Sequence, residues 1–456
     1  MKRNIWIYFI LLQPFLDVAT NFILKNFDFP ITIGVVVRMV FLAIALFFAI
    51  NYFIQHKEKK LLLLNIAVYV FLALNFIVNF IWKNNFSFMA EAEFLAKTAY
   101  PIQLFFVFYI LIKNNWLTRD KIVQLLTINL LAVSAFIIIP TAFNISFESY
   151  NEFYEGTIGW FNAANEIGAI VAFLVPIAIW GMYKKKTGWL GIVTVLAAVC
   201  AAYLIGTKVS LGSIIVVLLI FSAYILTKNR FRLNAPFFVV FLPLVLLLVT
   251  ISQAPAVQNI ENVREDVEAR EVRFENRETM YDTEQVQQME EFERLKEISH
   301  PVITSIVSSR DLFVIQHYEA YVESAPARMA FGLGYAANYE DEPKITEMDF
   351  FDYFFSFGII GLLLTIVVLF KPAVTIAQAI WNRIIARKEN SFMYSILLSI
   401  VLILGISFIA GHVIFAPGVS IYLVIGIALL AVLAEREEND DGFEEDETGS
   451  KASRNV

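Results

Sequence analysis

Cysteine and charge are both scarce in this chain of 456 residues. Its one cysteine, Cys200, excludes an intrachain disulfide and lies inside an apolar run. Only 17% of the residues are Asp, Glu, Lys or Arg, whereas 58% are hydrophobic. Soluble globular domains carry about 25% charged residues, so the composition excludes that class. Nothing in the distribution of Lys and Arg indicates binding to nucleic acid.

Three further features are missing. The N-terminus begins with positive charge, as a signal peptide does, but it has no small-residue cleavage site and carries Asp17, which predicts a retained first helix. No convincing internal repeat is present, although carriers often consist of two related halves. No compact D-x-D pair of acids stands at a membrane exit, so the sequence predicts no metal site and no cofactor.

Long apolar runs are what the sequence has instead. Runs of about 20 residues alternate with short turns rich in Lys and Arg, which predicts an all-α polytopic membrane protein with about 12 transmembrane helices. The predicted spans lie at residues 5–25, 31–54, 61–82, 92–113, 121–141, 161–183, 187–206, 208–227, 235–251, 350–370, 392–411 and 416–434.

Positive charge predicts the orientation of these helices. Lys and Arg cluster at alternate turns, and cytoplasmic loops are the ones enriched in these residues. The clusters occupy residues 2–3, 56–60, 113–121, 184–186, 228–232 and 371–388. We therefore expect a multi-pass protein of the plasma membrane with both termini in the cytoplasm.

The outer loop at residues 252–349 is far longer than the other outer loops. Residues 258–298 hold many acidic and basic side chains at i,i+4 spacing, which predicts solvated helix. Residues 302–339 are more apolar, and we expect them to pack on the membrane face. The predicted organisation is nine helices in residues 1–251, a partly helical extracellular loop domain at 252–349, three helices in 350–434, and a disordered acidic tail at 435–456.

Three cations stand at or near the outer face under this topology. Arg38 interrupts an apolar span, where it either snorkels to the interface or belongs to a functional site. Lys208 occupies a very tight outer turn, where a solvated lysine is the simplest alternative. Arg310 lies in the long outer loop, where pairing with Asp311 or another acid of that loop is the alternative.

Polar side chains also begin the span at 161–183 from the outside. They are Asn162, Asn165 and Glu166. The asparagines suit helix caps and Glu166 suits the first turn of a helix, but capping accounts for only one or two of the three. His412, at another outer helix end, is a further candidate, with a satisfied structural histidine as its alternative.

Carboxylates complete the set of outer polar groups. Glu347 and Asp349 precede an apolar span, either as helix-capping acids or as members of a site. Asp17 lies in the outer half of the first span, where Pro14 kinks the helix. Together these groups predict an outward-open polar cavity, with cations suited to a phosphate-rich head group and a carboxylate or histidine as base.

Four segments carry a family resemblance. They are GWFNAANEIG at 159–168, GTKVSLGS at 206–213, the loop segment from Ser308 to Tyr335 that ends in GLGY, and DFFDYFFSFGIIG at 349–361. In order and spacing they are similar to the motifs of the O-antigen ligase and polymerase superfamily, which also has one large outer loop before its last few spans. The resemblance covers residues 155–365 and, through the topology, most of the chain.

The resemblance implies a GT-C-like membrane glycosyltransferase in cell-surface polysaccharide biosynthesis. Its donor would be an oligosaccharide on undecaprenyl diphosphate, which the bilayer delivers. At the outer face the enzyme would either polymerise this saccharide or ligate it to another acceptor.

The resemblance also implies roles for the outer polar groups. The leaving diphosphate would be stabilised by Arg38, Lys208 and Arg310. Glu347 would deprotonate or orient the acceptor hydroxyl, with Asp349 and His412 as alternatives. The sugar would lie against Asn162, Asn165 and Glu166.

One position departs from the family pattern. Many ligases of this family carry a functional histidine eleven residues before the first glycine of the last motif. Counting back from Gly358 by that interval reaches Glu347. A carboxylate thus stands where the family has an imidazole, which favours a polymerase, or a ligase for a different polymer.

Two other functions stay open at this stage. A lipid-linked oligosaccharide flippase or another transporter also places polar residues inside a helix bundle, but its site belongs near the midplane, whereas these charges gather outside. A non-catalytic subunit of a polysaccharide export complex is the third hypothesis, in which residues 258–298 bind other assembly proteins. The expected partners of the enzyme are lipid-linked saccharide, a saccharide or cell-wall acceptor, and membrane lipid.

Overall fold

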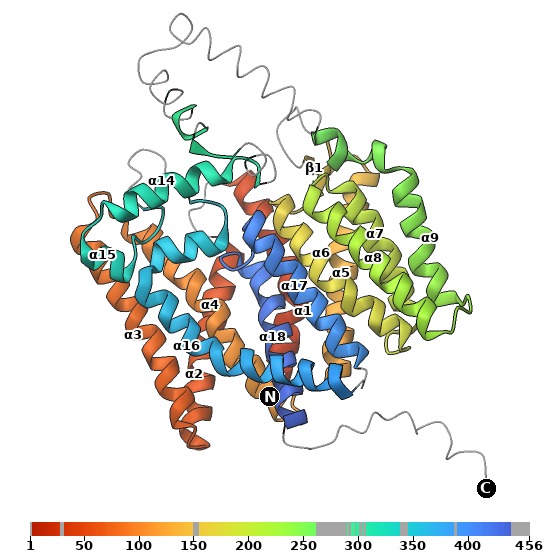
Figure 1. Ribbon diagram of the computed structural model, residues 1–456, viewed down its shortest axis with the longest axis horizontal. Helices are drawn as coiled ribbons and strands as arrows, with labels where there is room; N and C mark the ends of the chain where they lie inside the picture. Colours follow the sequence, from red (N-terminus) through yellow and green to blue (C-terminus); the bar gives the residue numbers. More distant parts are fainter. Residues whose placement is uncertain are drawn as a thin grey trace, which may run out of the picture.

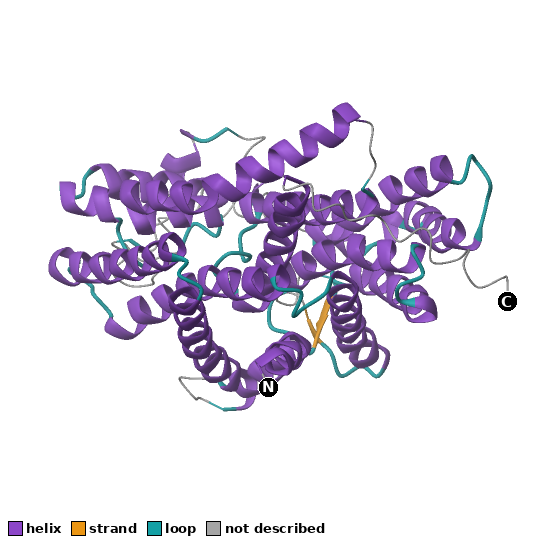
Figure 2. Cartoon of the chain, turned by 90° about the horizontal axis from the view of Figure 1, so that it is seen from below, coloured by secondary structure: helices purple, strands orange, loops and turns teal. Residues whose placement is uncertain are grey.

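A computed structural model of the chain contains a bundle of long helices and one small two-stranded sheet (Figures 1 and 2). The structure describes residues 2–27, 32–148, 155–260, 307–337, 345–386 and 390–438, together with residues 290, 293–296, 298–300 and 304. Most of the predicted helical segment at 258–298 lies outside the described residues.

The helices in chain order are α1 (Lys2–Asn26), α2 (Ile33–Gln55), α3 (Lys59–Trp82), α4 (Phe88–Lys113), α5 (Arg119–Ala142), α6 (Ala164–Tyr183), α7 (Gly188–Leu204), α8 (Lys208–Lys228), α9 (Ala235–Val249), α14 (Arg310–Val322), α15 (Pro326–Phe331), α16 (Asp349–Ala386), α17 (Ser391–Ile409) and α18 (Pro417–Glu438). A 3-10 turn, η1 (Ile251–Gln253), follows α9. The strands β1 (Phe147–Glu148) and β2 (Thr157–Gly159) pair antiparallel.

Helix length and composition confirm the predicted class, an all-α polytopic membrane protein. Within the described ranges, ten helices are long and apolar enough to cross a membrane. α7 and α9 are also apolar but shorter, at 17 and 15 residues. Each predicted span coincides with one of these helices. The total of about 12 crossings stays a prediction, because it depends on the two short helices.

α16 extends well past the predicted span at 350–370. It continues to Ala386 through a segment that the sequence predicts as a basic inner loop. Figure 1 shows this last part of α16 passing across the bottom of the bundle. Pro372 disfavours helix at the start of this part, but residues 371–386 contain no glycine, and the alanines and Arg383 among them are good helix formers.

α18 likewise continues into the segment predicted to be a disordered tail. Glu435 accepts a hydrogen bond from Tyr109 Oη at 2.8 Å, and Arg436 donates to Ile112 O at 3.0 Å. These contacts with the end of α4 keep the first residues of the segment helical rather than disordered. Residues 439–456 lie outside the described residues.

The two ends of the bundle carry different elements. Figure 1 shows the start of α1 and the end of α18 at the bottom, and α14, α15 and β1 at the top. Below, the word outer is only a label for this top side of the bundle, and the outer segment is the part of the chain at residues 307–337.

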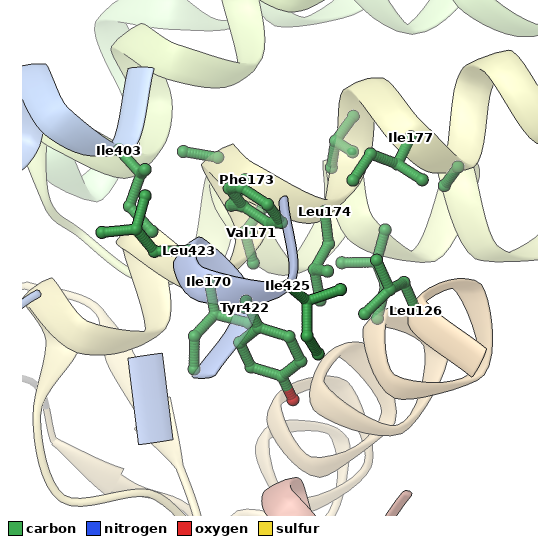
Figure 3. Close-up of a cluster of buried hydrophobic side chains, with 14 of the residues drawn as sticks. Leu126, Ile170, Val171, Phe173, Leu174, Ile177, Ile403, Tyr422, Leu423 and Ile425 are labelled. Atoms are coloured by element: carbon green, nitrogen blue, oxygen red, sulfur yellow. The ribbon is translucent and has the colours of Figure 1, made fainter. Parts of the chain in front are cut away.

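α6 and α18 form the centre of the bundle and are buried along most of their length. α6 packs against α5, α7, α8 and α17, whereas α18 packs mainly against α4. Figure 3 shows Ile170 of α6 beside Tyr422 of α18, with Phe173 in the same buried cluster. Gly426 makes this approach possible, because a Cβ there would lie 2.6 Å from the Phe173 ring. Helices that are apolar on nearly every side can be packed in the centre without leaving many polar groups unpaired.

The outer segment is joined to the bundle at a kink in α16. Gly358 has a φ of 61°, and a Cβ there would lie only 2.6 Å from Gly332 N. Both glycines are therefore required for the close approach of the two backbones. Leu333 N donates to Phe355 O at 2.8 Å, which pairs the GLG segment with the residues just before the kink. Two of the four sequence motifs thus contact each other.

Asparagines of α3 complete this junction. Asn75 Nδ2 donates to Phe331 O at 2.6 Å and to Ser356 O at 2.9 Å, so one amide bridges the outer segment and α16. Asn79 Nδ2 donates to Gly332 O at 3.2 Å. Carbonyl groups that the kink leaves without helical partners are satisfied by these bonds.

A buried ion pair holds the backbone of Tyr335 at the same junction. Lys83 Nζ lies 2.6 Å from Glu91 Oε1, and the two side chains are 6% and 1% exposed. Lys83 also donates to Tyr335 O, and Tyr335 N donates to Glu91 Oε2 at 2.9 Å. Burial lowers the pKa of Lys83, and the Glu91 carboxylate opposes that shift.

We expect Glu91→Gln to destabilise the protein, because it leaves the Lys83 ammonium buried without its counter-charge. Removing one partner of a buried pair costs about 3–5 kcal/mol. Glu93→Gln is the matched control, since it removes an exposed pair with Lys97 on the same helix, which is worth about 1 kcal/mol or less. Thermal unfolding in detergent should show a much lower midpoint for Glu91→Gln than for the control. Equal midpoints would contradict this account of the junction.

Candidate functional site

Arg310 and Glu347 are far apart in the sequence, but they form an ion pair in the structure. Arg310 begins α14, and Glu347 lies in the turn before α16. Arg310 Nη2 is 3.2 Å from Glu347 Oε2, and the side chains are 15% and 36% exposed. Asp311, the alternative partner of Arg310, instead accepts a hydrogen bond from Thr304 Oγ1 at 2.5 Å. The pair is therefore specific and still accessible to a ligand.

The backbone beside this pair is left-handed at three positions. Glu347 has a φ of 56°, and Ser308 and Ser309, directly before Arg310, have φ values of 56° and 64°. Residues other than glycine rarely adopt this conformation, which costs about 1–3 kcal/mol each. Such strain persists where surrounding contacts impose it, and it clusters at functional sites.

Asp349 lies next to the pair but is occupied by other donors. Its Oδ2 accepts hydrogen bonds from Ser407 Oγ at 2.7 Å and from Val413 N and Ile414 N at 2.9 Å each. The side chain is buried. A carboxylate with three donors on one oxygen suits fixing the 411–416 loop better than removing a proton from a substrate.

His412 belongs to the loop that Asp349 holds. It has a φ of 60°, and its side chain is half-buried. Gly411 packs on the Glu347 turn, where a Cβ would lie 2.5 Å from Glu347 O. Three predicted catalytic residues, Glu347, Asp349 and His412, are thus brought together.

Arg38 lies inside the bundle rather than extending to the interface. It is 6% exposed, and its Nη2 lies 2.5 Å from Asp17 Oδ1. Nε and Nη2 also donate to Gln13 Oε1 at 3.3 and 3.2 Å. Asp17, which the sequence places in the outer half of the first span, therefore supplies the counter-charge of Arg38. Gly418, at the start of α18, packs against this carboxylate.

Glu166 connects the Arg38 cluster with the start of α16. Charges on Asp17, Arg38, Lys97 and Asp349 all act on its carboxylate. These residues belong to α1, α2, α4 and α16. The gathering of these charges in one polar cavity stays a prediction.

Asn162 and Asn165 do not cap α6. The residue at the N-cap is Ala163, and no side chain makes a capping bond there. Asn162 is exposed and Asn165 is half-buried. Helix capping therefore does not explain these two asparagines.

Lys208 stands apart from the ion pairs. It is exposed at the start of α8 and makes no ion pair within the described part of the chain. The turn before it is fixed by Asn259, whose Nδ2 donates to Gly206 O at 3.0 Å and to Glu155 O at 2.8 Å. Gly168 of α6 packs against this turn, where an added Cβ would lie 3.4 Å from Thr207 Oγ1.

An apolar pocket lies elsewhere, between α7 and α9. It has a volume of about 650 Å3, and Cys200, Tyr203 and Leu246 are among its lining residues. None of the predicted site residues lines it.

Sequence reasoning missed the groups that hold the Glu347 turn. Thr346 N donates to Asp352 Oδ1 at 2.6 Å, and Thr346 Oγ1 accepts from Met348 N at 3.2 Å. The spacing of Thr346 and Asp349 matches a capping box, which was the available signal. In the structure, Thr346 N donates to Asp352, about one helical turn after Asp349, and not to Asp349 itself.

The comparisons with known proteins agree with the resemblance predicted from the four motifs. A protein-family profile described as O-antigen ligase like membrane protein matches residues 1–437. A search of curated proteins found no match, and neither did a search of solved structures. The family implies a membrane enzyme with glycosyltransferase-like activity that takes lipid-linked saccharide and an acceptor in the assembly of cell-surface polysaccharide. Because the match covers nearly the whole chain, this protein belongs to the family of O-antigen ligase like membrane proteins.

Proposed function

We propose that this protein polymerises or ligates oligosaccharides carried on undecaprenyl diphosphate at the outer face of the plasma membrane. One observation carries the proposal, the partly exposed ion pair between Arg310 and Glu347. Transfer at an anomeric carbon benefits from a cation beside the leaving diphosphate and a base beside the acceptor hydroxyl. This pair supplies both groups.

In the proposed step the acceptor oxygen forms a bond to the anomeric carbon, and the bond from that carbon to the diphosphate oxygen breaks. Glu347 takes the hydroxyl proton, while the electron pair of the broken bond leaves with the diphosphate. Arg310 contacts the diphosphate through its planar guanidinium and thereby releases the carboxylate. Guanidinium and ammonium groups take the electrostatic role that a metal ion has in other transferases.

The other polar groups take supporting roles in this proposal. Lys208 is exposed and can reach a diphosphate, whereas Arg38 shares its charge with Asp17 and contributes less. The sugar is proposed to lie along Asn162, Asn165 and Glu166. His412 is the second candidate for the base, and Asp349 holds the loop that carries it.

The acceptor distinguishes a polymerase from a ligase. Glu347 stands where many ligases of the family carry histidine, which supports a polymerase or a ligase for a polymer other than O-antigen. The acceptor would then be a second lipid-linked saccharide or a cell-wall component. No residue described here selects a particular sugar.

The proposed topology has α14 and α15 outside and both termini in the cytoplasm. Two observations support it. Basic clusters stand at alternate turns, and the outer segment lies at the end of the bundle opposite the start of α1 and the end of α18 (Figure 1).

The single native cysteine makes this orientation testable. In a Cys200→Ser background, we expect a membrane-impermeant maleimide to label Arg294→Cys in intact cells but to label Lys185→Cys only after permeabilisation. Both positions are exposed. Labelling of Lys185→Cys alone in intact cells would reverse the proposed orientation.

We expect Arg310→Ala and Glu347→Gln each to slow transfer by about 10²-fold or more, so that long polymer is lost in cells while protein abundance stays normal. Single lipid-linked units should then accumulate outside the membrane. Arg294→Ala is the matched control, because it breaks an exposed ion pair with Glu319 of α14 without touching the site. Polymer length is measured by electrophoresis and protein abundance by immunoblot.

The outcomes separate the hypotheses. Units trapped on the cytoplasmic side would favour a flippase, and normal polymer from both variants would contradict the proposed site.

The two substitutions should also be strongly non-additive. If Arg310 and Glu347 act in one step, the double variant Arg310→Ala/Glu347→Gln should transfer saccharide no more slowly than the worse single variant. The measurement is the initial rate in membranes that hold equal amounts of each variant. Rate losses that multiply would show that the two residues act independently.

A further inference from the structure

We propose that Asp352, acting through Thr346, is a positioning residue that holds Glu347 toward Arg310. The inference rests on the proposed function for the role of Glu347, but the placement itself can be tested without catalysis. Asp352 does not touch the pair, so it acts only through the backbone of the turn.

The turn needs such a holder because Glu347 is strained. Its φ of 56° lies in the left-handed region, where a residue with a Cβ is disfavoured. Without outside contacts this residue would relax to an ordinary conformation, and its side chain would leave the direction of Arg310. The 3.2 Å ion pair therefore depends on what fixes the backbone on both sides of Glu347.

Both neighbours of Glu347 are fixed by the same pair of side chains. Thr346 N donates to Asp352 Oδ1 at 2.6 Å. The Thr346 hydroxyl accepts from Met348 N at 3.2 Å and donates to Met348 O at 3.3 Å. Asp352, Thr346 and Met348 are all buried, so water does not compete for these bonds.

The turn is also supported from its other side. Gly411, with a φ of 61°, lies against Glu347 O, and Asp349 holds the following residues Val413 and Ile414. The backbone of Glu347 is thus enclosed between the first turn of α16 and the 411–414 loop. Only its side chain is left partly exposed, facing Arg310.

Asp352→Ala and Asp352→Asn distinguish positioning of Glu347 from mere stabilisation of the helix end. Asparagine keeps an oxygen that can accept from Thr346 N, whereas alanine removes it. We expect Asp352→Asn to keep nearly the wild-type rate and Asp352→Ala to lose about 10²-fold in kcat with little change in KM, the size typical of a misplaced catalytic group. Thr346→Val should behave like Asp352→Ala, and Thr346→Ser like the wild type. Rates are measured per folded protein, in membranes that hold the lipid-linked saccharide of the expressing cells.

A cross-linking measurement tests placement without catalysis. Cys200→Ser with Arg310→Cys and Glu347→Cys leaves two cysteines, which a short bifunctional methanethiosulfonate can join. Added Asp352→Ala should slow cross-linking several-fold, while added Asp352→Asn should not.

Each outcome decides between the two claims. If Glu347→Gln is fully active while Asp352→Ala still slows cross-linking, the proposed function fails and the placement by Asp352 stands. Unchanged cross-linking together with an unchanged rate per folded protein in Asp352→Ala would overturn the inference, even if the thermal midpoint falls, because Asp352 would then only stabilise the helix end.

Discussion

The cost of placing charge beside hydrocarbon is the constraint on which this structure depends. An ionised group that leaves water is stable only with a counter-charge or several hydrogen bonds. Arg38 has Asp17, Lys83 has Glu91, and Arg310 has Glu347. Two of these pairs, Arg38–Asp17 and Arg310–Glu347, join segments that are far apart in the chain, so charge compensation also helps to decide which helix ends meet. The outer end of the bundle is assembled by these contacts, and the apolar centre around α6 and α18 gives them a rigid support.

The second organising contact is between backbones. Gly332 and Gly358 allow the outer segment to lie directly on the kink of α16, and Asn75 bridges the two segments. This junction fixes the first turns of α16, from which Asp349 and Asp352 extend. The Lys83–Glu91 pair anchors the same segment to α3 and α4. A site at the start of α16 is therefore connected to the bundle through several independent bonds, which is how a strained residue such as Glu347 keeps its conformation.

The sequence predicted the helices well because apolar runs of membrane length are a strong signal. Predicted spans and described helices coincide, except where α16 and α18 continue past their apolar cores. That Arg310 and Glu347 lie at the same end of the bundle was also predictable from charge and order along the chain. Their pairing was not, since Arg310 had a nearer acid in Asp311. The sequence also offered Asp349 as an alternative base and as a helix-capping acid, whereas tertiary bonds from Ser407 and the 413–414 backbone occupy it, and Asp352 accepts the bond from Thr346 N. Such long-range choices leave no local pattern.

The central claim is that Arg310 and Glu347 carry out transfer from a lipid diphosphate. The most direct measurement uses the purified full chain in nanodiscs with lipid-linked saccharide and follows undecaprenyl diphosphate and new glycosidic linkages together. The account predicts one released diphosphate for each linkage formed in the wild type, and both products at least about 10²-fold more slowly from Glu347→Gln of equal folded content. Linkages formed at the wild-type rate by Glu347→Gln and Arg310→Ala, or no diphosphate released by the wild type, would contradict it.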